Sequence, residues 1–128
     1  MPVKLFSDVT SATSRATQIF PILIAAAANR RTLTYGVLAD MLGFGGAGVF
    51  ATQLGHIMHW CADNDLPPLT VLVVNAKTGL PGAGLWRIEN LHADREKVFG
   101  YSWYQLVPPT IEELNEADKA RKNAKKRG

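Results

Sequence analysis

The sequence has only one cysteine, Cys61, so the chain cannot form an internal disulfide. Its longest apolar run, residues 19–28, is ten residues long and contains Pro21. A helix that crosses a bilayer needs about 20 apolar residues. Residues 1–15 also lack the continuous apolar region of a signal peptide, so we expect no export. These absences predict a cytoplasmic protein without a membrane segment.

Acidic residues are missing from the last ten positions of the chain. This segment, residues 119–128 (KARKNAKKRG), holds six of the fourteen basic residues, which leaves eight basic and eleven acidic residues in 1–118. The high isoelectric point of 9.2 is therefore caused by this segment. It is the main source of any long-range attraction to phosphates, although such cationic runs are also common on proteins that bind no nucleic acid.

The sequence also lacks the residue combinations on which enzyme chemistry depends. Neither paired carboxylates nor a serine, histidine and acid set can be assembled, and NAKTGLPGAG matches no nucleotide-binding pattern. His56 and His59 are three residues apart but have no third metal ligand. Cys61 falls on the apolar side of its helix, where burial makes a thiol a poor nucleophile. We expect no enzyme activity, no metal and no small-molecule cofactor.

Two helices are predicted in the first third of the chain. The first starts at Thr10 or Ser11 and runs toward residue 29, with Pro21 expected to kink it or to move its start. The second follows the N-cap Thr34 and ends at Gly43, which accepts a left-handed conformation. Its predicted apolar face comprises Val37, Leu38, Met41 and Leu42.

A third helix is predicted after the turn FGGAG, and the prolines of DNDLPP are expected to end it. Apolar residues recur along it with the spacing of a core-facing side. This stripe comprises Phe50, Leu54, Ile57, Met58 and Cys61. The opposite side is expected to face solvent, with Thr52, His56, His59 and Asp63 flanked by Gln53 and Trp60.

A β-hairpin is predicted after the third helix. LTVLVV is β-branched and apolar and favours a strand, whereas NAKTG favours a turn in which Gly79 takes a positive φ. LPGAGLWRI offers a returning strand, which Pro81 and its glycines weaken. Three helices followed by a hairpin are the order of a winged helix-turn-helix, with the third helix as the recognition helix and the hairpin as the wing.

The chain is expected to form one globular domain over residues 1–108, with the winged-helix core at about 10–90. Residues 109–128 form a charged C-terminal helix and a basic tail. This helix begins with a capping box at Thr110 and Glu113 and carries its acids early and its bases late. The predicted fold class is therefore α+β and winged-helix-like.

Within about residues 20–84, the chain resembles the C-terminal domain of the O6-alkylguanine-DNA alkyltransferases and their alkyltransferase-like relatives. That family has a TYGELA-like start, a glycine-bearing helix and a PCHRVV…G segment in this order. TYGVLADMLG, ATQLGHI and PLTVLVVNAKTG follow one another here in the same way. The resemblance implies a winged-helix domain that binds duplex DNA.

The residues that carry the family's chemistry are absent from this chain. Aligning VV at 73–74 with the family's paired valines places Thr70 at the alkyl-accepting cysteine and Val71 at the neighbouring histidine. The arginine that fills the gap left by a flipped base falls near Thr52. The resemblance therefore implies DNA binding without alkyl transfer.

The first functional hypothesis is weak binding of double-stranded DNA with little sequence preference. Thr52, Gln53 and His56 would face base edges, and Lys77 on the wing would reach phosphate. Tyr35, in the TYGVLA motif, is the remaining expected contact.

The alternative hypothesis is a small bacterial or phage regulatory protein without a nucleic-acid role. It would bind a protein partner, or a second copy of itself, through His56, His59 and Trp60. This face has an aromatic residue but no Arg or Lys, which is more typical of protein interfaces than of DNA readers. A core position is an equally good interpretation of Trp60.

Overall fold

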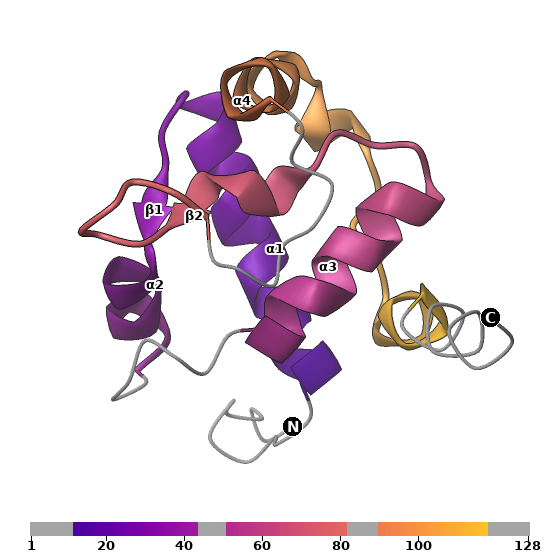
Figure 1. Cartoon of the computed structure of the whole chain (residues 1–128). Coiled ribbons are helices and arrows are strands. Elements are labelled where there is room, and N and C mark those ends of the chain that lie inside the picture. The colour runs from indigo at the N-terminus through magenta and orange to yellow at the C-terminus, as the bar shows by residue number, and fades with distance from the viewer. Residues whose placement is uncertain (1–11, 44–50, 82–89, 118–128) are drawn as a thin grey trace, which may run out of the picture.

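The structure is a computed structural model that describes residues 12–43, 51–81 and 90–117. Over these ranges the chain is mostly helical, with a small two-stranded parallel sheet (Figure 1). The predicted α+β class is therefore confirmed in its coarse form. The core is built on α1 (Ala12–Ala28), against which α3 (Ala51–Asp63) packs.

The first helix begins where its capping signal predicts and continues without interruption past Pro21. Pro21 therefore does not move the start of α1. Its ring lies on the exposed side of the helix, while Ile19, Phe20 and Leu23 are buried. Proline removes one backbone donor from the helix, and the burial of the neighbouring apolar side chains compensates for that loss.

The second helix, α2 (Tyr35–Leu42), has the two ends that its sequence predicts. Oγ1 of Thr34 accepts a 3.1 Å hydrogen bond from the Val37 amide, and Gly43 takes a φ of 78°. The predicted apolar face is only half right. Leu38 and Leu42 are buried, whereas Val37 and Met41 are 47% and 58% exposed.

The third helix buries the stripe that its sequence predicts. Leu54, Ile57, Met58 and Cys61 are all in the core, while Phe50 lies outside the described residues. α3 contacts α1 and also contacts η3 (Leu69–Leu72), the 3₁₀ helix that follows.

The predicted strand LTVLVV is wrong over its first four residues, which form η3. Pro67 and Pro68 precede this segment, and the Val71 amide donates to the Pro68 carbonyl at 3.1 Å. All four residues of η3 are buried. A short apolar run that is buried on every side has no period that separates strand from helix, and the β-branched composition was therefore a misleading signal.

The remaining two residues, β2 (Val73–Val74), pair in parallel with β1 (Leu33–Thr34) and not with a following strand. The predicted antiparallel wing is reduced, within the described residues, to one isolated bridge between Val74 and Pro81. Residues 82–88, the rest of the predicted returning strand, lie outside the described residues.

The last third of the chain closes over α1. α4 (Leu91–Gly100) and η4 (Trp103–Gln105) both contact α1, and Nε1 of the buried Trp103 donates to the Val98 carbonyl at 2.8 Å. Arg30 follows α1 and reaches α4, where it lies 2.7 Å from Oε1 of Glu96 and over the Phe99 ring.

The C-terminal helix, residues 111–117, begins at the predicted capping site. The Glu113 amide donates to Oγ1 of Thr110 at 3.1 Å. Leu114 and Ala117 are its buried residues, and residues 118–128 lie outside the described part of the chain. None of the helices in the described ranges is long and apolar enough to span a bilayer.

Candidate nucleic-acid interface

The start of α3 carries two of the predicted DNA contacts, Thr52 and Gln53. Thr52 is exposed, as expected for a residue that contacts DNA. Gln53 is half-buried, and its Oε1 atom is fully covered without a hydrogen-bond partner among the described residues. The acceptor of this amide is therefore not available to a base edge in this conformation.

His56 and Trp60 do not face solvent. This corrects the DNA-binding hypothesis, which placed His56 at base edges, and the interaction hypothesis, which placed both residues on an exposed face. Only 7% of His56 and 8% of Trp60 is exposed. The Trp60 ring packs edge-on against Phe20, with 5.6 Å between centroids. Trp60 is thus a core residue. In this conformation His56 is buried and cannot face base edges or a protein partner.

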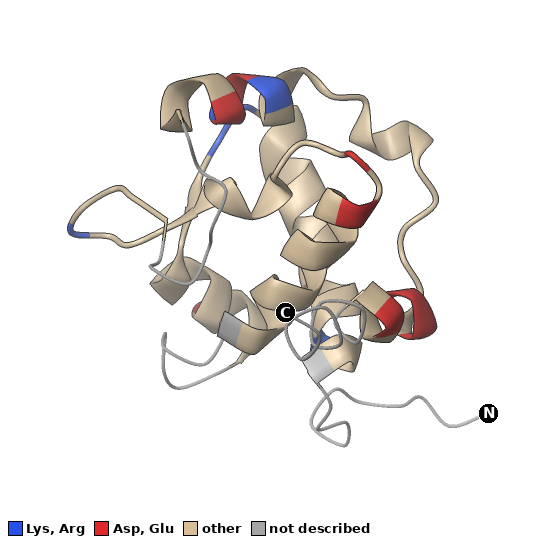
Figure 2. Ribbon diagram, turned by 45° about the vertical axis from the view of Figure 1, so that its right-hand side comes forward, with Lys and Arg blue, Asp and Glu red and all other residues tan. Residues whose placement is uncertain are grey.

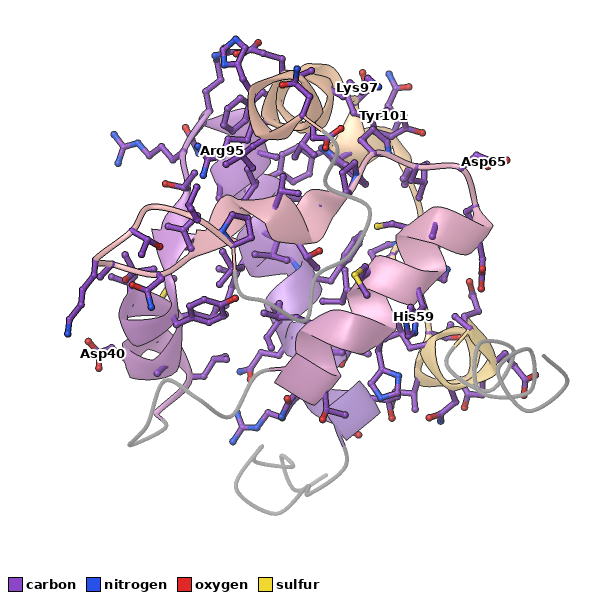
Figure 3. The ribbon with its side chains drawn as sticks, viewed as in Figure 1. Asp40, His59, Asp65, Arg95, Lys97 and Tyr101 are labelled. Carbon is purple, nitrogen blue, oxygen red and sulfur yellow. The ribbon has the colours of Figure 1, made fainter. Side chains whose placement is uncertain are left out.

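The C-terminal helix lies beside the side of α3 that carries Trp60 and Asp63. This side also carries Gln53 and His56. Counted from Gln53, the other three residues follow after three, seven and ten positions, a spacing that places them on one side of α3: His56, Trp60 and Asp63. A groove on that side is lined by Trp60 and Asp63 from α3 and by residues of the C-terminal helix: Glu112, Glu113, Glu116 and Ala117. His59 is half-buried and also lies on the side of α3 toward the C-terminal helix (Figure 3).

The turn after β2 presents the exposed Lys77 at its tip. We call residues 75–80 the Lys77 turn. Oδ1 of Asn75 accepts from the Lys77 amide at 2.8 Å, and Gly79 takes a φ of 69°. Nη2 of Arg95 donates to the Gly79 carbonyl at 2.8 Å and so ties the turn to α4.

Tyr35 and the Lys77 turn lie at the same edge of the small sheet. Thr34 is opposite Val74 in the parallel pairing, so Tyr35 and Asn75 both follow directly beyond the carboxyl ends of the strands. Tyr35 is half-buried and Lys77 is exposed. The structure therefore places Tyr35 and the Lys77 turn in segments that leave the same edge of the sheet, whereas His56 is buried on α3 and Gln53 is half-buried there.

Charge is distributed unevenly over the described residues. Acidic residues gather on the C-terminal helix and at the end of α3, while the Lys77 turn projects from the opposite side with a basic residue at its tip (Figures 1 and 2). The acids on the first side are Asp63, Asp65, Glu112, Glu113 and Glu116. A polyanion would approach the side with the Lys77 turn more easily.

An apolar surface that was not predicted lies beside α2. The exposed side chains of Val37 and Met41 are four residues apart on one face of the helix. Next to Met41 is an open groove of about 660 Å³ that α1 lines with Pro21, Ile22, Ala25 and Ala26. The sequence shows these residues as apolar, but only the contacts of α2 decide which of them remain uncovered.

The position of the alkyl acceptor holds no reactive group. Thr70 and Val71, which the resemblance places at the family's cysteine and histidine, are buried residues of η3. Burial raises the pKa of the Cys61 thiol to about 12, so its thiolate is not formed at neutral pH. No group of three or more potential metal ligands occurs within the described ranges.

Comparisons with protein-family models, with curated proteins and with solved structures found no significant match to this chain.

Proposed function

We propose that this chain is a non-catalytic, cytoplasmic DNA-binding protein that contacts a duplex through the start of α3 and the Lys77 turn. The proposal rests on one observation above all. A basic turn projects beside Tyr35, on the side of the molecule opposite the cluster of acids. In this proposal, α2 and α3 are a helix-turn-helix and the Lys77 turn is a reduced wing.

The chemistry of these residues favours positioning over sequence readout. Lys77 supplies a charge for a phosphate, and the hydroxyl group of Thr52 supplies a donor and an acceptor. Gln53 can read adenine through both ends of its amide only if its Oε1 atom is uncovered. We therefore expect weak affinity with little sequence preference, to which residues 119–128 add a large electrostatic part.

A salt titration tests this proposal. Binding of a fluorescent 20-base-pair duplex, followed by anisotropy, should weaken steeply as the salt concentration rises. Changing the six basic residues of 119–128 to glutamine keeps the chain length and should reduce the magnitude of the log–log slope by up to about five. Absence of binding to any duplex at low salt would remove the proposal.

The second candidate function is docking of a protein partner or a second copy, now at α2. The observation that favours it is the exposed pair Val37 and Met41 beside the apolar groove, since such uncovered apolar side chains often belong to interfaces. Light scattering of the wild type and of Met41→Lys tests self-association. A concentration-dependent mass that Met41→Lys lowers supports it, and a monomer in both proteins removes the homodimer.

A further inference from the structure

The Lys77 turn is closed by its own hydrogen bonds. Oδ1 of Asn75 accepts from the amides of Lys77 and Thr78 at 2.8 and 3.3 Å. The Gly79 amide donates to the Asn75 carbonyl at 2.8 Å, and the Asn75 amide donates to the Leu80 carbonyl at 2.9 Å. These bonds fix the shape of the turn, but none of them reaches another element. The direction in which Lys77 projects therefore depends on how the turn is attached to the rest of the molecule.

The attachment of the turn through the sheet is short. β2 contributes only Val73 and Val74, which pair with the two residues of β1. After the turn, Pro81 forms a single bridge with Val74, and no further antiparallel pair occurs within the described ranges. A two-stranded hairpin is at best marginally stable by itself. The turn therefore gains from support by another element.

Arg95 of α4 supplies that support. Its Nη2 atom donates to the Gly79 carbonyl, 16 residues earlier in the chain, at 2.8 Å. Arg95 lies on the side of α4 that is nearer the turn, whereas Lys97 lies on the other side (Figure 3). The Arg95 side chain is half-buried and its Nε atom is fully covered. A planar guanidinium that is held in this way loses little further freedom when it forms a hydrogen bond.

α4 is itself fixed to the core. It contacts α1 and η3, and its residue Val98 is fully buried. Arg30, directly after α1, donates to both carboxylate oxygens of Glu96, at 2.7 and 3.0 Å, and lies over the Phe99 ring. The hydrogen bond from Arg95 therefore holds the turn relative to the core, and not only relative to its neighbours in the sequence.

We propose that Arg95 is a positioning residue, whose hydrogen bond to Gly79 holds the turn so that Lys77 meets a duplex phosphate. This inference rests on the proposed DNA-binding function. A lysine on a loosely attached turn has to be ordered when the duplex binds, and this ordering costs binding free energy. Arg95 lowers that cost because it orders the turn beforehand. Arg95 thus acts through Lys77 and does not bind a second phosphate.

A double-mutant cycle tests this role. Arg95→Met keeps a long side chain and a high helix propensity but loses every donor, and Lys97→Met removes the same charge from the other side of α4. In the anisotropy titration, Arg95→Met should weaken duplex binding nearly as much as Lys77→Met and clearly more than Lys97→Met.

The salt dependence separates positioning from direct contact. Arg95→Met and Lys77→Met should each reduce the magnitude of the log–log slope by up to about one. The double variant should also reduce it by about one and not by two, because both substitutions remove the same phosphate contact.

NMR relaxation of the protein without DNA gives a second readout. The amides of Lys77 and Thr78 should have order parameters near about 0.85 in the wild type, and Arg95→Met should lower them toward about 0.6. Amides of α1 should keep their values, which also establishes that the variant is folded. Lys97→Met should leave the turn unchanged.

Three results would overturn the positioning role and leave the proposed function intact. These are unchanged order parameters in the Arg95→Met turn, duplex binding by Arg95→Met equal to that of Lys97→Met, and a slope reduced by about two in the double variant, which would make Arg95 a separate phosphate contact. Absence of duplex binding by the wild type would remove the proposed function, and the positioning role with it.

Discussion

Cys61 illustrates how much burial changes the chemistry of a single residue. Its side chain lies in the core stripe of α3, where desolvation disfavours the thiolate more strongly than a backbone hydrogen bond from Leu69 favours it. The pKa of this thiol therefore rises from 9.0 to about 12. A cysteine of this kind contributes packing and not reactivity.

We predict that Cys61 makes the protein less stable at alkaline pH. Because the pKa is higher in the folded state, the unfolded chain loses the thiol proton first as the pH rises. The free energy of unfolding should be unaffected by this group below about pH 9 and should fall by about 1.4 kcal/mol per pH unit from there toward pH 12.

Urea unfolding of the wild type and of Cys61→Ala at several pH values measures this effect. Other groups also titrate in this range, so the difference between the two proteins isolates the thiol. The variant should be less stable than the wild type at pH 7 because a buried sulfur is lost, and the difference should shrink as the pH rises. A difference that is constant from pH 7 to pH 11 contradicts the prediction.

His56 and Gln53 show the limit of reasoning from a single residue. Both are polar and both fall on the polar side of α3, so the sequence predicts exposure. In the structure His56 is buried and Oε1 of Gln53 is covered, and the C-terminal helix, more than fifty residues later in the chain, returns to the side of α3 that carries Trp60 and Asp63. The helical period of α3 contains no information on that return.

At the scale of the elements, two glycines on neighbouring helices have opposite roles. Gly43 ends α2 with a φ of 78°, a conformation that costs an L-amino acid free energy. Gly55 lies inside α3 in helical conformation, and a Cβ atom there would meet no atom within 4 Å. Glycine inside a helix is unfavourable compared with alanine.

We therefore predict opposite effects for the same substitution. Gly55→Ala should raise the free energy of unfolding by about 0.5–1 kcal/mol, because the unfolded chain loses freedom and helix propensity increases. Gly43→Ala should lower it by about 1 kcal/mol, because the left-handed conformation becomes strained. Chemical denaturation of the two variants measures both changes, and stabilisation by Gly43→Ala would mean that α2 ends differently.

At the scale of the whole molecule, the separation of charge sets the direction from which a polyanion is bound. Lys77 and Lys97 are both exposed, but Lys97 lies on α4 and lines a groove that also contains Asp65, Asp94 and Glu96. Figure 3 shows Lys97 beside Tyr101, on the same side as Asp65. The two lysines are therefore alike in charge and exposure but differ in location, so a substitution of Lys97 is a matched control for the same substitution of Lys77.

We predict that Lys77→Glu weakens duplex binding clearly more than Lys97→Glu does. Both variants change the net charge equally, so a difference between them reports location and not total charge. Lys77→Glu should also reduce the magnitude of the salt slope by about one, because one phosphate contact is lost. Equal effects of the two substitutions, measured by anisotropy at several salt concentrations, would place the duplex elsewhere.

Local signals in the sequence determined a large part of this molecule. The cap at Thr34, the positive φ of Gly43 and Gly79, and the capping site at Thr110 were all predicted, because each depends on residues within one turn. The core stripe of α3 was predicted for the same reason, since a period of 3.6 residues is a local property.

Contacts between distant segments decided the rest. LTVLVV forms η3 and a parallel pair with Leu33–Thr34 because it is buried between α1, α3 and α4, and a short apolar run carries no record of these neighbours. The exposure of Met41 and the burial of His56 likewise depend on which elements pack against α2 and α3. Sequence patterns specify which faces can be buried, whereas the free energy of packing between segments far apart in the chain selects the faces that are.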